Sequence, residues 1–337
     1  MISRRDALVL GSGLAGVVLA TRTVLAQSRY PERPIRLVIP FVPGGVTDVV
    51  GRHWANAMKA LLGSVVIENQ GGAGGTIGAA AVARAAADGY TILLGSAPSL
   101  VVNPIAGPTR YDPVSDFAPI SILGVVPVAF VANPALPARN LAELVAYAKA
   151  NPGKLSYGTP GAGTMGHLGG ELLKSLAGTS DVVHVPYKGA GPALSDVIGG
   201  QIPLALLSVN GQMLELHQSG KVRIISVAAA TRLVSAPDIP TVVEQGFPGL
   251  VTHNFYGLFA PAATPLAIVE QMSHATRTAM ADDKFREQLV AAGFEPYRDA
   301  SSEAARRFLA DEIARWRPVI TAAGLKLGTR RSGSDRA

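Results

Sequence analysis

The chain has 337 residues, of which 48% are hydrophobic and 16% charged, and a formal net charge of +6. It contains no cysteine, which excludes a disulfide scaffold, a cysteine nucleophile and a cysteine metal cluster. Residues 1–26 contribute +2 and residues 326–337 contribute +3, so residues 27–325 carry only +1. This body lacks the basic stripe of a nucleic-acid-binding protein, and its length predicts two domains.

Residues 1–26 are predicted to be an export signal. The pair Arg4-Arg5 is typical of a twin-arginine signal, and an uncharged apolar run follows from Ala7 to Ala20. The run is shorter than the roughly 20 residues of a membrane-spanning helix. We expect cleavage near Ala26, with export by the twin-arginine or the general route left open.

A glycine pattern inside this signal matches a dinucleotide-binding fingerprint. Gly11 to Gly16 read G-x-G-x-x-G, but that fold needs a strand before the glycines and a second strand ending in an acidic residue. Pro31 and Pro34 crowd the second strand, where Glu32 would be the acidic residue. The sequence therefore favours no nucleotide and predicts no cofactor.

The mature chain begins with a strand, a glycine pair and a helix. Ile35–Ile39 is a nearly continuous apolar strand. Gly44 and Gly45 let backbone approach a ligand closely, and Thr47 or Asp48 is expected to cap the helix that follows. Free N–H groups of its first turn would face the loop and suit a carboxylate or a phosphate. A plain strand-to-helix connection is the alternative.

Further strands at 65–68 and 90–94 flank a helix that is expected to reach Ala87. This alternation predicts a parallel sheet with helices on both faces. Ligands of such sheets lie beyond the carboxyl ends of the strands. The loops at 42–48 and 95–99 would both lie there, and the second of them contains Ser96. The glycine loop at 71–75 lacks the Lys-Ser/Thr ending of a phosphate-binding loop, and we expect a surface or hinge-side turn.

A second α/β unit follows the apolar segment 125–131, with Asn140 expected to cap its first helix. Strand 155–158 leads into a loop that runs from Thr159 to Gly163, and Thr164 is expected to cap the next helix. Strand 182–188 contains Tyr187 and ends before Gly189, Ala190 and Pro192, with Pro192 expected at the first helical position. Two units that both aim helix N-termini at glycine loops predict a cleft that holds an anion.

Ordered motifs along the whole mature chain then carry a family resemblance. They include Pro40-Phe41-Val42-Pro43-Gly44-Gly45, Tyr111-Asp112-Pro113, Asn151-Pro152-Gly153-Lys154, Gly158-Thr159-Pro160-Gly161 with His167-Leu168, Val183-His184-Val185-Pro186-Tyr187-Lys188-Gly189 and Ala236-Pro237-Asp238-Ile239-Pro240-Thr241. The chain resembles the substrate-binding proteins of tripartite tricarboxylate transporters, often called Bordetella uptake gene proteins.

The resemblance implies an α/β fold of the periplasmic-binding-protein type II kind, with two doubly wound lobes joined by crossing hinge strands. It implies a monomeric periplasmic receptor that closes on a small carboxylated metabolite and delivers it to a membrane permease. It also implies no chemistry, cofactor or metal of its own.

We expect residues 27–127 and 256–325 in the first lobe, 128–255 in the second, and a disordered basic tail at 326–337. Helices after Pro261 should pack on the first lobe. The crossings near 126–131 and 252–259 would act as the hinge, with closure driven by ligand contacts to both lobes.

The predicted ligand contacts lie on the loop-to-helix turns of both lobes. They are Gly44, Gly45, Thr47, Asp48, Ser96, Thr159, Gly163, Thr164, Tyr187, Gly189 and Ala190. Hydroxyls and backbone N–H groups would donate, and helix termini would supply positive potential in place of arginine. The hydroxyls are equally explained as helix caps, His167 is expected to make a structural hydrogen bond, and Lys188 is expected to be exposed.

One departure from the family bears on the ligand. Members commonly carry acidic residues after Gly199-Gly200-Gln201, whereas residues 202–207 carry none here. An ammonium group would need an acidic or carbonyl partner, so we expect a carboxylate without an amino group.

Two other functions are alternatives to a transport receptor. A hydrolase is disfavoured because neither G-x-S-x-G nor H-E-x-x-H occurs. A sensor that presents its bound ligand to a signalling partner stays open, since one fold serves either role.

Overall fold

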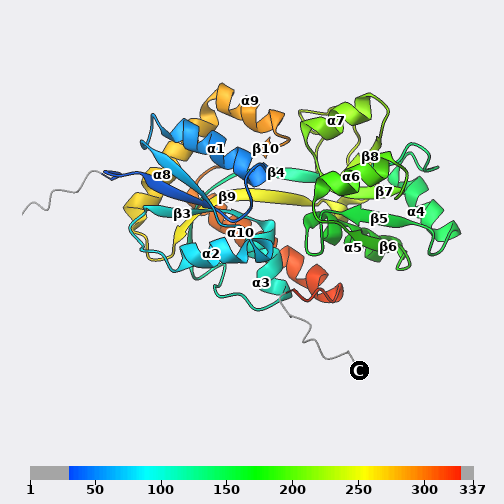
Figure 1. Ribbon diagram of the computed structural model, residues 1–337, viewed down its shortest axis with the longest axis horizontal. Coiled ribbons are helices and arrows are strands. Elements are labelled where there is room, and N and C mark those ends of the chain that lie inside the picture. Colours follow the sequence, from blue (N-terminus) through cyan, green and yellow to red (C-terminus); the bar gives the residue numbers. More distant parts are fainter. Residues whose placement is uncertain (1–29, 328–337) are drawn as a thin grey trace, which may run out of the picture. The chain divides into compact units, whose positions relative to one another are not determined.

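The computed structural model describes residues 30–327 (Figure 1). The predicted export signal, its glycine pattern and residues 328–337 lie outside the described residues. The chain divides into a unit that ends at Glu32 and a unit that begins at Arg33, and the fold is that of the second unit. No helix within residues 30–327 has the length and apolar character needed to cross a membrane.

The strands form one mixed sheet in the order β2-β1-β3-β9-β4-β7-β5-β6, while β10 and β8 also pair with β4. Their bounds are β1 Ile35–Ile39, β2 Val65–Asn69, β3 Thr91–Ser96, β4 Phe117–Ala132, β5 Ser156–Thr159, β6 Val183–Pro186, β7 Leu204–Ser208, β8 Arg223–Val227, β9 His253–Pro261 and β10 Glu295–Pro296. β1 to β3 run parallel, as do β5 to β7. The strands predicted from the alternating pattern are among them, whereas β7 was not predicted.

Strand β4 links the two lobes of this sheet. Its first part, to Pro127, pairs antiparallel with β9, and its last part, from Val128, pairs with β7 and β8. Figure 1 shows β4 and β9 running between a lobe that holds β1 and β3 and a lobe that holds β5 to β8. The chain also returns at this point, because the Val128 N–H donates to the Thr252 carbonyl at 2.9 Å.

Helices cover both faces of each lobe (Figure 1). Those of the first lobe are α1 Val46–Met58, α2 Thr76–Ala83, α3 Asn103–Ala106, α8 Leu266–Ala281, α9 Asp283–Ala291 and α10 Ser302–Ala322, and those of the second are α4 Leu141–Ala150, α5 Met165–Ala177, α6 Ala190–Ile198 and α7 Gly211–Gln218. Short turns η1 Ala73–Gly75, η2 Pro98–Val102 and η3 Pro248–Leu250 complete the elements. α2 thus ends at Ala83, four residues before the predicted end.

Helix caps show where local sequence rules held. Asn140 and Thr164 accept the N–H groups of Glu143 and His167, as predicted. The predicted cap of α1 is wrong: Gly45 caps it with extended backbone, so that Thr47 and Asp48 lie inside the first turn. Pro192 is likewise the third residue of α6 and not its first. Gly189, the cap of α6, has a φ of +127° that suits glycine, whereas the extended backbone of Gly45 needs no glycine.

Two buried tryptophans fix the helices of the first lobe. Trp54 of α1 donates Nε1–H to Thr276 Oγ1 of α8 at 3.1 Å, and Trp316 of α10 donates Nε1–H to Glu312 at 3.1 Å. Both are fully buried, so each indole needs the partner it has. α8 and α10 pack on β4, and α10 also contacts α5 of the second lobe.

Candidate functional site

Asp48 closes the first loop-to-helix junction. Its carboxylate accepts hydrogen bonds from the Gly44 N–H at 3.0 Å, from Asn69 Nδ2 at 3.0 Å and from Arg52 Nε at 2.8 Å. Burial alone would raise the pKa of Asp48, but these hydrogen bonds hold the pKa below its usual value. Asp48 is 3% exposed, so its negative charge stabilises the loop between β1 and α1.

Thr47, in the same turn, joins a second hydrogen-bond network. Its hydroxyl is hydrogen-bonded to the Tyr256 phenol, which burial gives a pKa of about 12. Asn254 donates to the Tyr256 oxygen at 2.7 Å and accepts the Ala97 N–H at 3.2 Å. The network therefore ties α1 to the end of β3 through the crossing strand β9.

Ser96, the last residue of β3, carries an unpaired hydroxyl. Its side chain is 1% exposed, yet Oγ has no hydrogen-bond partner within residues 30–327. Its backbone is satisfied by Ser99, whose Oγ accepts the Ser96 N–H and donates to the Ser96 carbonyl, both at 3.1 Å. A buried hydroxyl without a partner costs about 1–3 kcal/mol, which makes Ser96 Oγ a candidate ligand donor.

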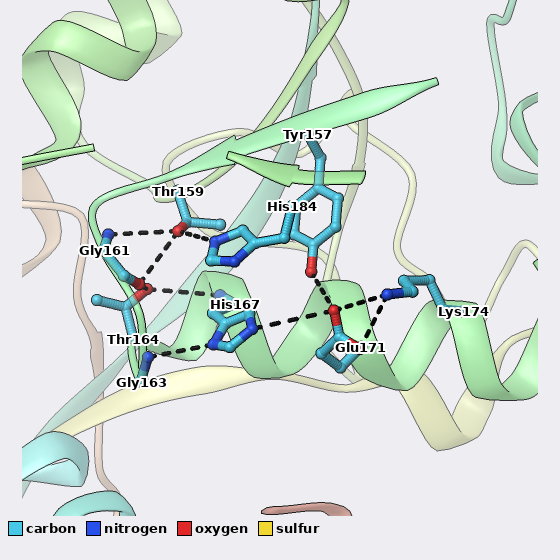
Figure 2. Close-up of polar contacts among 9 residues, drawn as sticks. All are labelled: Tyr157, Thr159, Gly161, Gly163, Thr164, His167, Glu171, Lys174 and His184. Carbon is cyan, nitrogen blue, oxygen red and sulfur yellow. Dashed lines mark hydrogen bonds and ion pairs between the residues drawn. The ribbon is translucent and has the colours of Figure 1, made fainter. Parts of the chain in front are cut away.

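The second junction lies between β5 and α5 (Figure 2). Thr164 Oγ1 accepts the His167 N–H at 3.4 Å and donates to the Gly161 carbonyl at 2.8 Å. Thr159 Oγ1 donates to the same carbonyl at 3.1 Å and accepts the Gly161 N–H at 3.3 Å. Both hydroxyls thus hold the loop, and Gly163 reaches a φ of +77° that suits glycine.

Two stacked histidines lie directly behind this loop. The rings of His167 and His184 are 4.0 Å apart at 12° to each other. His167 Nδ1 accepts the Gly163 N–H at 3.1 Å, and His184 Nε2 lies 2.7 Å from Thr159 Oγ1. The structural hydrogen bond predicted for His167 is confirmed, and Figure 2 shows the rings holding opposite ends of the loop.

Partly buried polar side chains extend the histidine pair along α5. Glu171 accepts the Tyr157 hydroxyl at 2.8 Å and pairs with Lys174 at 2.9 Å. Burial alone would raise the pKa of Glu171, but hydrogen bonds from Lys174 and Tyr157 hold the pKa below its usual value. Burial, together with the neighbouring His167, lowers the pKa of His184 to about 4.

The β6-to-α6 turn supports the second junction from one side. The Tyr187 N–H donates to the Thr159 carbonyl at 2.9 Å, and the Gly189 N–H donates to the Pro160 carbonyl at 3.0 Å. The Tyr187 hydroxyl donates to Asp196 at 2.6 Å, and burial with this hydrogen bond raises the pKa of Tyr187 to about 12. Ala190 begins α6, and Lys188 is exposed as predicted.

A cavity of about 400 Å³ lies where segments of both lobes meet. Its walls come from the loop after β1, the η1 turn, the segment from η2 to α3, the end of the described chain and the loop between β5 and α5, called the α5 loop below. The lining residues are Phe41, Ala73, Gly74, Thr76, Pro98, Asn103, Pro108, Thr109, Ala162, Gly163, Thr164 and Leu327. Asn103 braces one wall by donating to the carbonyls of Gly74 at 3.0 Å and Pro98 at 2.7 Å. Residues 71–74 are exposed, as expected of a surface turn, whereas Gly75 is buried, and Ala73 and Gly74 also line this cavity.

The chemistry of the lining is neutral. None of the lining residues carries a charge, and the beginnings of α2 and α5, at Thr76 and Met165, adjoin or lie in the wall. First-turn N–H groups have no partner within their own helix and carry partial positive charge. No set of three metal-binding side chains occurs within residues 30–327. The lining can thus accept an anion through backbone dipoles, with apolar contacts to its body.

The cavity brings together only part of the predicted site. Gly163 and Thr164 line it, whereas the other predicted contacts do not. They lie in the turns at or before the start of α1, α5 and α6 or, in the case of Ser96, at the end of β3. Sequence reasoning missed the wall formed by η1, Asn103 and Leu327. The glycine loop before Thr76 carries the same loop-to-helix signal as the two junctions, while no local pattern marks Leu327.

Comparisons with known proteins agree with this architecture. Residues 50–325 match the family model described as the tripartite tricarboxylate transporter family receptor. The chain is 36% identical to Protein BugT of Bordetella pertussis over 93% of this chain and 97% of that protein.

Solved structures give the same picture. An R. palustris protein solved with adipate is 33% identical with a TM-score of 0.77, over 88% of this chain and 99% of that one. MatC of Rhodopseudomonas palustris, solved with bound malate, is 32% identical with a TM-score of 0.74, over 86% of this chain and 100% of that one.

Proposed function

The chain belongs to the tripartite tricarboxylate transporter receptor family, and on that premise we propose that it is a periplasmic receptor for a small carboxylate that carries no amino group. It closes on this acid and delivers it to the membrane permease of a tripartite tricarboxylate transporter. It acts as a monomer and performs no chemistry on the ligand. The observation that supports this proposal most directly is the neutral cavity lined by segments of both lobes.

The lining supports a carboxylate without help from arginine. The Thr164 hydroxyl is already used as a helix cap, so the anion is held by the backbone of the α5 loop and by the start of α2. Helix N-termini suit an anion because free N–H groups and the helix dipole act together. Phe41, Pro98 and Leu327 offer apolar surface to the carbon chain of the ligand.

Ser96 supplies a further donor in this proposal. Its buried hydroxyl lacks a partner within the described chain and lies two residues before Pro98 of the cavity wall. Closure of the lobes around a ligand would bring an acceptor to it, which removes the cost of an unpaired buried hydroxyl.

The absence of charge in the wall supports a ligand without an ammonium group. An ammonium buried without an anionic or carbonyl partner is strongly disfavoured, and the lining holds no carboxylate. The ligands named for two solved relatives, adipate and malate, are also acids without an amino group. We extend that ligand class to this chain.

The direct test is a binding screen by calorimetry with adipate, malate, aspartate and glutamate. We expect an amino-free acid to bind more tightly than either amino acid. Tighter binding of aspartate or glutamate than of any amino-free acid would overturn the ligand class.

A matched pair of variants tests the location. Ala162 is exposed in the cavity wall and makes no side-chain hydrogen bond. Ala162→Asp places a negative charge there and should weaken the best acid about tenfold or more, whereas Ala162→Asn, of equal size, should change affinity little. Equal effects of the two substitutions would place the carboxylate elsewhere.

A further inference from the structure

The two stacked imidazoles behind the α5 loop have a role that goes beyond packing. His184 Nε2 lies 2.7 Å from Thr159 Oγ1 at the start of the loop, and His167 Nδ1 accepts the Gly163 N–H at its end, 3.1 Å away (Figure 2). We propose that His167 and His184 are positioning residues that hold this loop in its ligand-binding form, and that the hold on Gly163 exists only while His167 Nδ1 is unprotonated. Acid therefore weakens carboxylate binding. This inference rests on the proposed function.

The hydrogen-bond chemistry at His167 fixes its protonation state. A backbone N–H can donate only to a ring nitrogen without a proton, so the single ring proton of His167 is on Nε2. That nitrogen faces Glu171 Oε1 at 3.9 Å. A proton added at Nδ1 would set two N–H groups against each other, and the Gly163 N–H would lose its acceptor.

The neighbouring ring limits how the pair takes up charge. Two imidazolium rings 4.0 Å apart would repel each other inside a partly buried group. Since burial and His167 already disfavour charge on His184, the first proton of the pair falls on His167. The loop thus responds to one proton at one nitrogen.

The remaining titratable groups around the pair come from two elements. Tyr157 of β5 stacks on His184 with ring centres 5.1 Å apart, and Glu171 and Lys174 lie on α5. Burial lowers the pKa of His167, Glu171 raises it and Lys174 lowers it, with a net shift below the usual value. Glu171 is already paired with Lys174 and hydrogen-bonded to Tyr157. His167 therefore takes up its proton at a lower pH than an ordinary histidine does.

The first experiment needs no ligand. In protein labelled with nitrogen-15, NMR should show a scalar coupling between the Gly163 amide nitrogen and His167 Nδ1 at about pH 7.5, where histidine of ordinary pKa is neutral. The coupling should vanish, and the Gly163 amide signal should move, as the His167 ring takes up its proton. No coupling at neutral pH, or a coupling that persists when the ring is protonated, would overturn the inference.

The second experiment measures adipate or malate affinity, whichever binds, by calorimetry at about pH 7.5 and at the acid pH at which the NMR spectrum shows the His167 ring protonated. For the unaltered protein we expect affinity to fall about tenfold in acid, the effect of one lost hydrogen bond at the site. His167→Asn keeps an acceptor near Nδ1 but has no titratable ring, so its affinity should stay within about twofold across this range. His167→Leu should bind weakly at both pH values.

A distant histidine provides the control. His274 is exposed on α8, and His274→Asn should keep the pH profile of the unaltered protein. Affinity that is equal at both pH values would overturn the inference and leave the proposed function intact. If no carboxylate binds at either pH, the proposed function fails, and the NMR coupling alone decides whether the histidines hold the loop.

Discussion

Leu327 lies against the backbone of Gly163, so the end of the described chain touches the glycine loop of the second lobe. A Cβ atom added at Gly163 would lie 2.7 Å from Leu327 Cδ1. Leu327 is itself anchored on the first lobe, because its N–H donates to the Ala106 carbonyl at 3.0 Å. This residue of the predicted tail is therefore part of the folded structure.

Gly163→Ala should destabilise the protein for two separable reasons. The φ of +77° strains any side chain, and the new methyl group would collide with Leu327, which together should cost about 1–3 kcal/mol. In Gly163→Ala/Leu327→Ala the collision is removed and the strain remains. Urea unfolding of both single variants and the double variant should show partial recovery. Full additivity would mean that the two residues do not touch in solution.

Asp48→Asn should destabilise the first junction by about 1–3 kcal/mol at neutral pH, since the charge that holds Gly44 and Arg52 is lost. The pKa of Asp48 is lowered in the folded protein, so its contribution is present above the unfolded value and is lost as pH falls through the folded value. Urea unfolding should therefore show the deficit of the variant shrinking in strong acid. Asp283→Asn is the control, because the Asp283 side chain is 92% exposed. An equal loss of unfolding free energy in this variant would contradict the role given to Asp48.

Ser96→Ala and Ser99→Ala should differ in their effects: the first on carboxylate binding, the second on the free energy of unfolding. Ser96 Oγ has no partner in the described chain, so its removal should leave the unfolding free energy unchanged or slightly higher while weakening carboxylate binding. Ser99 Oγ makes two hydrogen bonds to the Ser96 backbone, so its removal should cost about 1–3 kcal/mol of stability. A Ser96→Ala protein that binds as well as the original would remove Ser96 from the site.

His184 should make stability depend on pH between about 4 and about 6.5. Its folded pKa of about 4 lies below the unfolded value of 6.5, so the unfolded chain binds the proton first. Stability from this residue is full above the unfolded value, falls as pH drops to about 4 and levels off below, for a total on the order of 3 kcal/mol. Urea unfolding across this range should show a smaller slope for His184→Gln, and an unchanged slope would refute the assignment.

Much of the fold was predictable because its signals are local. The apolar run of β1, the caps Asn140 and Thr164, and the strand-helix alternation all appear within short windows of sequence. The antiparallel crossing by β9 was expected only as a hinge position, since pairing between β4 and β9 depends on residues far apart in the chain. The full length of β4, from Phe117, was missed for the same reason.

The position of the site was predictable from the sequence, but the roles of its individual residues were less so. Glycine loops before helices located both junctions, but the sequence could not tell which hydroxyls point to protein partners. Thr159 and Thr164 turned out to hold Gly161, and Asp48 turned out to hold Gly44. Which atoms remain free depends on side-chain directions set by tertiary packing. The ligand contacts and the lobe boundaries at 127/128 and 255/256 remain predictions.

The meeting of Val128 and Thr252 at one hydrogen bond has an evolutionary consequence. The segment between them leaves and re-enters the first lobe at a single point, so its two ends lie together, as insertion into a host domain requires. Such a segment can be exchanged as a cassette while the strands on the other side of β4 keep their order. Replacement of this one compact insert would change the part of the cavity wall formed by Ala162, Gly163 and Thr164, without rebuilding the half of the molecule that carries β1 to β3.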